Sequence, residues 1–310
     1  MNQSMPVVSI GMPVFNGEYT ISYALDSILE QEFTDFEIHI SDNHSTDRTP
    51  EIIKEYMAKD SRIRYFRQPR NIGAYKNFEY VLSLSRGKYF MWAAADDWRS
   101  PNFLGECVKL LESHKSCVAA TSFDKFIGRN QINTFTLAGS KSERLKQFID
   151  NSFHSNALFY SLMHRELCDD FNFELLECLA GDWIFICFLA QRGDILRSPD
   201  ALTIFSDNGM SYSESRYSMF RSRLAHWFYP LLNFSRFAYT LSKNDSKAAR
   251  SNIEAKLFSL NHYTALDQAS LETRKAHSLA KIVIIRVALK AISTRLGLYL
   301  YRRFFGFALA

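Results

Sequence analysis

Strand-like and helix-like segments alternate over the first 122 residues of the chain, with a period of roughly 25 to 30 residues. Short apolar, β-branched runs are typical of buried strands, and the amphipathic segments between them are typical of helices. The expected strands are residues 7–12, 36–41, 63–66, 89–93 and 117–121. This alternation predicts an α/β fold of the Rossmann-like kind, with a mostly parallel sheet flanked by helices.

The pattern becomes less regular after residue 122. We expect a strand over residues 158–163, a helix over 180–191 and two short strands at 195–196 and 202–205. From about residue 217 the pattern is helical and rich in aromatic residues. The sequence therefore predicts one α/β domain with halves at 1–122 and 123–212, followed by a helical, basic C-terminal extension over 213–310.

Cysteine usage and the absence of targeting segments predict a cytoplasmic protein. The five cysteines are odd in number and form no C-x-x-C pair, so we expect buried thiols in a reducing compartment rather than disulfides or a zinc site. No basic segment followed by an apolar run begins the chain, and no uncharged apolar run reaches the ~18 residues of a membrane span.

Charge is distributed unevenly along the chain. The net charge is +4, yet residues 273–310 contain eight basic residues and no acidic one, so the remainder is mildly acidic. A segment that is both basic and apolar is suited to an anionic membrane surface, and we expect peripheral contact at the inner face of the membrane. The alternative is a C-terminal helix packed on the body. No recognition motif accompanies the charge, so we expect no nucleic-acid partner.

Polar residues follow each of the first four expected strands, where ligands of open α/β sheets bind. These segments are residues 13–18, 42–47, 70–73 and the pair Asp96–Asp97. The glycine loops that cradle phosphates in other nucleotide folds are missing. Two adjacent carboxylates after a strand could instead hold Mg²⁺ or Mn²⁺, which would bridge a diphosphate. The alternatives are that Asp97 caps a helix and that Asp42 and Asn71 are ordinary turn residues.

The order of these segments resembles glycosyltransferase family 2, which has the GT-A fold. Four blocks carry the resemblance: Pro13-Val14-Phe15-Asn16 after the first strand, Ser41 to Thr49, Asn71-Ile72-Gly73 with Lys76-Asn77, and Gly87-Lys88-Tyr89-Phe90 leading to Ala94-Ala95-Asp96-Asp97. The match is specific over about residues 6–122 and weaker to about 212. Two positions depart from the family's pattern, because Ser41 and Ala94 stand where the family has acids.

The resemblance implies a role for each matched residue. Asp42 would accept a hydrogen bond from the imide N–H of the donor's base, and Asp97 would ligate the divalent metal. Asp96 would face the ribose. The other residues implied in nucleotide-sugar binding are Pro13, Phe15 and Glu18 at the base pocket, and Asn71 and Lys76.

The resemblance also places a catalytic base in the second half of the domain. Asp182 lies in the stretch Ala180-Gly181-Asp182-Trp183, at the expected start of a helix. The ordinary alternative for such an Asp is helix capping. Glu174 and Glu177 are the other acids nearby. Trp183 could either stack on an acceptor sugar or pack in the core.

A family 2 member would transfer a sugar with inversion from a nucleoside-diphosphate sugar, most simply a UDP-linked one, to a hydroxyl of a glycan or lipid-linked glycan. The sugar would be a hexose or an N-acetylhexosamine, used in cell-surface polysaccharide synthesis. Ala94 keeps open a second function, a non-catalytic glycan-binding or scaffolding member of the same fold. A dinucleotide-dependent oxidoreductase is a third alternative, against which the missing glycine fingerprint argues.

Overall fold

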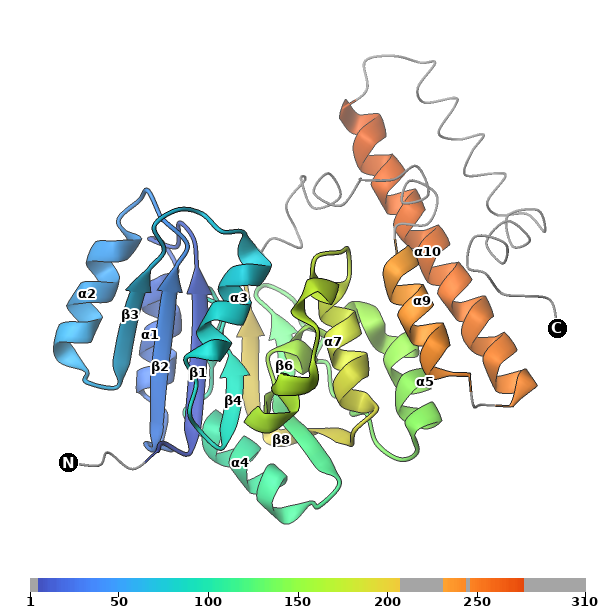
Figure 1. Cartoon of the computed structure of the whole chain (residues 1–310), viewed down its shortest axis with the longest axis horizontal. Helices are drawn as coiled ribbons and strands as arrows, with labels where there is room; N and C mark the ends of the chain where they lie inside the picture. Colours follow the sequence, from blue (N-terminus) through green and yellow to red (C-terminus); the bar gives the residue numbers. More distant parts are fainter. Residues whose placement is uncertain (1–4, 207–230, 244–245, 276–310) are drawn as a thin grey trace. The chain divides into compact units, whose positions relative to one another are not determined.

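The computed structural model describes residues 5–206, 231–243 and 246–275 of the chain (Figure 1). The chain divides into two compact units. The first consists of residues 1–174 and 185–209, and the second of residues 175–184 and 210–310. Every described strand belongs to the first unit, and the two described C-terminal helices belong to the second.

An eight-stranded sheet with the order β3-β2-β1-β4-β7-β6-β8-β5 forms the centre of the first unit. The pairs β1–β2, β2–β3, β1–β4 and β6–β8 are parallel, whereas β7 and β5 pair antiparallel with their neighbours. The sheet is therefore mixed and mostly parallel, as the sequence predicts. The strands are β1 (Val8–Val14), β2 (Phe36–Asp42), β3 (Ile63–Arg67), β4 (Tyr89–Trp92), β5 (Trp98–Arg99), β6 (Cys117–Phe126), β7 (Leu162–His164) and β8 (Asp194–Phe205).

Helices flank this sheet, with α3 on the face of β1, β2 and β4 that is turned toward the viewer in Figure 1. Gly11 of β1 allows this close packing, because a Cβ there would lie 2.7 Å from the Val81 side chain of α3. The helices are α1 (Ile21–Leu29), α2 (Thr49–Lys59), α3 (Ala74–Ser83), α4 (Phe103–Ser113), α5 (Lys141–Asn151), α6 (Asn156–Phe159) and α7 (Gly181–Ala190). Short 3₁₀ helices occupy Ser152–His154, Arg165–Asp170 and Phe173–Leu176.

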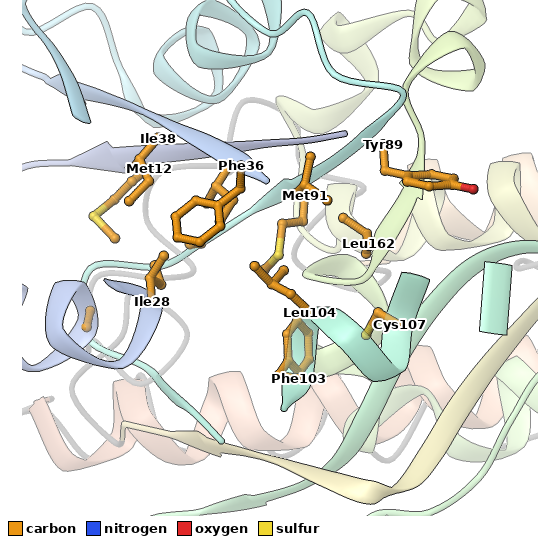
Figure 2. Close-up of a cluster of buried hydrophobic side chains, with 14 of the residues drawn as sticks. Met12, Ile28, Phe36, Ile38, Tyr89, Met91, Phe103, Leu104, Cys107 and Leu162 are labelled. Carbon is orange, nitrogen blue, oxygen red and sulfur yellow. The ribbon is translucent and has the colours of Figure 1, made fainter. Parts of the chain in front are cut away.

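The main core lies between α1, α4 and the other face of the sheet (Figure 2). Alternate residues of β1 and β2, such as Met12 and Ile38, point into it and are fully buried. The period of two in each strand therefore separates an apolar face under α1 from a face under α3. A second buried set is aromatic: the rings of Trp92 and Phe159 stack with centroids 5.1 Å apart.

The structure corrects three of the expected elements. The run 158–163 is not one strand, because its first part ends α6 and only its last residues enter β7. The two short strands expected at 195–196 and 202–205 are one strand, β8, which bulges between Ser198 and Leu202. Both β5 and α5 were absent from the sequence prediction, although α5 begins with a capping box formed by Ser140 and Glu143.

The described part of the second unit is helical. It contains α9 (Leu232–Leu241) and α10 (Lys247–Lys275), which are tied by a 2.8 Å hydrogen bond from Asn261 Nδ2 to Ser235 Oγ. Within the described residues, no helix combines the length and apolarity needed to cross a membrane. Apart from the end of α10, the basic segment 273–310 lies outside the described residues.

Candidate active site

The loops after β1 and β2 are joined by hydrogen bonds at the carboxyl edge of the sheet. The backbone N–H of Asn16 donates to Ser45 Oγ (2.9 Å), and that of Gly17 donates to Thr49 Oγ1 (2.8 Å). The Asn43 N–H donates to the carbonyl oxygen of Val14 (2.8 Å). The structure therefore brings together the first two polar segments that the sequence singled out.

In the expected nucleobase pocket, the ring of Phe15 is exposed and the carboxylate of Glu18 already accepts a hydrogen bond. Phe15 is 50% exposed, so its ring is accessible to a flat partner, and Pro13 beside it is half-buried. Glu18 Oε2 instead accepts a hydrogen bond from the Arg48 backbone N–H (3.0 Å). In this structure Glu18 ties the β1–α1 loop to the start of α2.

Asp42 ends β2 and is completely buried. Its Oδ1 accepts from the Ser45 N–H (2.7 Å) and its Oδ2 from the Tyr65 hydroxyl (3.0 Å), while Arg67 Nε lies 3.6 Å from Oδ2. Burial, together with the charge of Asp42, raises the pKa of Tyr65 well above its ordinary value. Because Asp42 is completely buried, its carboxylate presents no surface to a base in this structure.

Asn71 is positioned by an amide network. Its Oδ1 accepts from Asn43 Nδ2 (3.0 Å) and from the Gly73 N–H (2.9 Å), and Asn43 Oδ1 accepts from the Ile72 N–H (2.8 Å). Asn71 is therefore a turn residue that also fixes the third loop against the second. Lys76 lies in the first turn of α3 and is exposed, which leaves its ammonium group accessible to an anion.

Asp96 and Asp97 follow β4 at the same edge, and Asp97 is almost fully buried. Burial raises the pKa of both carboxyls, that of Asp97 to about 7, although the positive charge of Arg99 acts in the opposite direction. Asp97 Oδ1 accepts from the Ser206 N–H (3.3 Å), whereas Oδ2 is buried and has no hydrogen-bond partner among the residues that the structure describes. Asp97 caps no helix, because α4 begins only at Phe103.

The donor set at Asp97 fits a hard divalent cation. A buried carboxylate oxygen without a partner is costly unless a ligand completes it. No cluster of three or more metal-ligating side chains exists among the described residues. Mg²⁺ commonly needs only one or two carboxylates, with substrate phosphates and waters as its other ligands. One Asp at the sheet edge is therefore compatible with a metal that is completed by a diphosphate.

Three further charged residues near Asp97 were not singled out by the sequence. Arg99 is the last residue of β5 and is 2% exposed. Asp124 near the end of β6 forms a fully buried ion pair with Arg197 of β8. The negative charge of Asp124 also contributes to the raised pKa of Asp97. Isolated Arg and Asp residues carry no spacing signal, so only the fold could place them here.

Asp182 belongs to the second unit and is the second residue of α7. Burial raises its pKa to about 6, while a hydrogen bond from the Trp183 N–H acts to lower it. Asp182 therefore lies inside the first turn of α7 rather than at the N-cap position, and its carboxylate is more basic than that of an ordinary Asp. Trp183 is buried and packs edge-on against Phe234 with ring centroids 5.3 Å apart, so its indole is part of the core of this unit.

The family model for glycosyl transferase family 2 matches residues 9–171, just over half of the chain. The chain belongs to this family. Among similar curated proteins, an uncharacterized glycosyltransferase of Methanocaldococcus jannaschii is 28% identical over 195 residues, 58% of this chain and 67% of that protein. The chondroitin synthase of Escherichia coli is 33% identical over 121 residues, 38% of this chain but 17% of the synthase.

Several curated family relatives are much longer than the region they share with this chain. An uncharacterized protein of Mycobacterium bovis is 41% identical over 114 residues, and that match spans only 32% of its length. Substrates and partners of such proteins therefore do not transfer with the shared region.

Solved structures share the fold of this family 2 chain at low sequence identity. Residues 1–349 of S. aureus TarS in complex with UDP-GlcNAc give a TM-score of 0.62 and 16% identity, over 96% of this chain and 87% of that TarS chain. A mannosyltransferase of Pyrobaculum calidifontis in complex with GDP-Man and Mn²⁺ has a TM-score of 0.54 and 15% identity, over 98% of this chain and 84% of that one. These likenesses establish the GT-A fold.

Proposed function

We propose that this family 2 enzyme transfers a hexosyl or N-acetylhexosaminyl group from a UDP-linked sugar to a hydroxyl of a glycan or lipid-linked glycan. The observation that carries the proposal is the buried, partnerless Oδ2 of Asp97 at the sheet edge. The complexes of similar folds with UDP-GlcNAc and with GDP-Man and Mn²⁺ support it by analogy. The likeness to a chondroitin synthase favours a role in cell-surface polysaccharide synthesis.

The donor would bind along the loops at the carboxyl edge of β1 to β4. Phe15 would stack on the base, with Pro13 and Glu18 shaping that pocket, and Asp42 would receive the imide N–H once Arg67 moves aside. Asn71 and Lys76 would hold the nucleotide, and Asp96 would face the ribose. The exposure of Phe15 and Lys76 is consistent with these roles.

Asp97 would hold Mn²⁺ or Mg²⁺, which supplies positive charge where the leaving diphosphate develops negative charge. Asp182 would accept the proton of the acceptor hydroxyl as that oxygen attacks the anomeric carbon. The bond to the diphosphate breaks on the opposite face, so the anomeric centre inverts. A carboxyl with a pKa of about 6 is ionised at neutral pH and is more basic than an ordinary Asp, which suits a general base.

The test is a screen of nucleotide sugars for release of the nucleoside diphosphate, with Mn²⁺ or with a chelator and with oligosaccharide acceptors. We expect turnover with a UDP-sugar, and its loss in the variant Asp97→Asn. Asp35→Asn is the matched control, because Asp35 is exposed just before β2, at the other end of the strand. Binding of glycans without turnover of any donor would instead indicate the non-catalytic function that Ala94 suggests.

A further inference from the structure

Arg99 is a buried cation whose side chain donates no hydrogen bond to any described residue. Its side chain is 2% exposed, and none of its three nitrogens, Nε, Nη1 and Nη2, makes a hydrogen bond within the described part of the chain. Its guanidinium group lies 5.5 Å from the ring centroid of Phe103. An unpaired buried charge is strongly unfavourable, and an apolar side chain of similar volume would stabilise the fold more. The cost indicates that Arg99 serves a state in which a negative charge is added nearby.

The position of Arg99 identifies where that negative charge would be. Arg99 follows Asp97 by two residues and pairs with Thr203 of β8 in the antiparallel register. Asp97 lies immediately before β5, and a separation of two residues limits the distance between the Cα atoms of Asp97 and Arg99 to about 7 Å. Among the charges that act on Arg99, that of Asp97 is the largest, and Asp96 also contributes.

Arg99 and Asp97 do not satisfy each other. The ion pairs between described residues do not include one between these two side chains, and Asp97 Oδ2 lacks a hydrogen bond as well. A purely structural pair would close to hydrogen-bond distance, because each partner removes the cost of the other. The charge of Arg99 is therefore not compensated by a direct contact with Asp97.

We propose that Arg99 is a built-in positive charge that supports binding of the donor's diphosphate, so that the nucleotide still binds when the metal is absent. This inference rests on the proposed function. Ala94 removes one acid of the family's motif, which leaves fewer carboxylates to repel a diphosphate or to hold a cation. Arg99 is buried and acts through its field, so it is a positioning residue rather than a catalytic one. The low dielectric around it strengthens that field.

The test measures UDP affinity by calorimetry, in Mn²⁺ and in EDTA, for the wild type, Arg99→Met and Arg99→Lys. We expect the wild type to keep UDP binding in EDTA within about tenfold of its affinity in Mn²⁺. Arg99→Met should bind UDP about tenfold more weakly in EDTA, as expected for one charge pair at an effective dielectric of about 20 and about 10 Å. Arg99→Lys should restore that binding. Arg64→Met is the control, since Arg64 is exposed on β3.

Thermal unfolding of the same variants separates this role from a structural one. Because the guanidinium is unpaired, Arg99→Met should unfold at the same temperature as the wild type or higher. Wild-type UDP affinity of Arg99→Met in EDTA would overturn the inference. The inference would also be overturned if Arg99→Met unfolds at a lower temperature and Arg99→Lys recovers the wild-type unfolding temperature but not UDP binding in EDTA. If the wild type binds UDP in Mn²⁺ but not in EDTA, the role of Arg99 is overturned while the proposed function stands. If the wild type binds no UDP in either condition, the role of Arg99 and the proposed function are both overturned.

Discussion

Replacing Asp97 by Asn should make the free energy of unfolding less dependent on pH. Burial raises the pKa of Asp97 to about 7, from an ordinary value near 3.8. Between these two values the folded state binds the proton more tightly than the unfolded state does. The unfolding free energy of the wild type therefore falls as pH rises through this window. Asn has nearly the same shape and no proton to lose.

The size of the effect follows from the two pKa values. One pKa unit corresponds to about 1.4 kcal/mol, and most of the window lies between pH 5 and pH 8. Over that range the wild type should lose about 2 to 3 kcal/mol relative to Asp97→Asn, in the absence of metal. At pH 8 the ionised carboxylate is buried with one oxygen unpartnered, which is the source of the loss.

The assay is urea unfolding at pH 5 and pH 8 in EDTA, with Asp35→Asn as the control variant. Addition of Mn²⁺ at pH 8 should stabilise the wild type and leave Asp97→Asn unchanged, because a ligand stabilises only the folded state that binds it. Parallel pH profiles for the wild type and Asp97→Asn would refute the electrostatic argument. A response of Asp97→Asn to Mn²⁺ equal to that of the wild type would refute the metal role.

Three other predictions concern the nucleobase pocket, the catalytic base and the C-terminal segment. Asp42→Ala should weaken UDP binding about tenfold in calorimetry, since a charge-assisted hydrogen bond contributes roughly 1.5–3 kcal/mol. Tyr65→Phe should change the UDP affinity little. If the two variants lose UDP affinity equally, Asp42 acts only in holding the turn. Asp182→Asn should lower transfer at least about a hundredfold and keep UDP affinity, and a near wild-type rate would pass the base role to another acid. Deletion of residues 273–310, or 1 M salt with its screening length of ~3 Å, should release the protein from acidic liposomes in sedimentation; salt-insensitive sedimentation of both forms would leave a packing role.

The first four strands were predictable because each is an apolar run that ends at a polar loop. β8 was not predictable as one strand, since Ser198, Pro199 and Asp200 have the composition of a turn. In the structure these residues form a bulge, where Ser122 pairs with Ser198 and Phe123 pairs with Leu202. The run 158–163 was ambiguous for another reason: six apolar and small residues are too few to distinguish a helix end from a strand.

The place of the candidate donor site was predictable, but its detail was not. Motif order singled out Asp42 and Asp97, which lie after β2 and β4 where ligands of open α/β sheets bind, and their roles stay predictions. The burial of Asp42 under Tyr65 and Arg67 depends on contacts between β2 and β3 that no motif encodes. Arg99 was missed because β5 is only two residues long and has no periodicity to show which side is buried.

Ala94 and Arg99 both make the candidate donor site more positive than a site with an acid at position 94 and no buried arginine. An acid at position 94 would add a negative charge, and Arg99 already contributes a buried positive one. Ala94 is half-buried, two residues before Asp96. Ala94→Asp should therefore tighten Mn²⁺ binding and weaken UDP binding in EDTA, because the added charge attracts the cation and repels the diphosphate. Calorimetry with Mn²⁺ alone and with UDP alone measures the two effects separately. If the Mn²⁺ affinity and the UDP affinity both rise or both fall, the charge at position 94 does not act on the two ligands electrostatically as proposed.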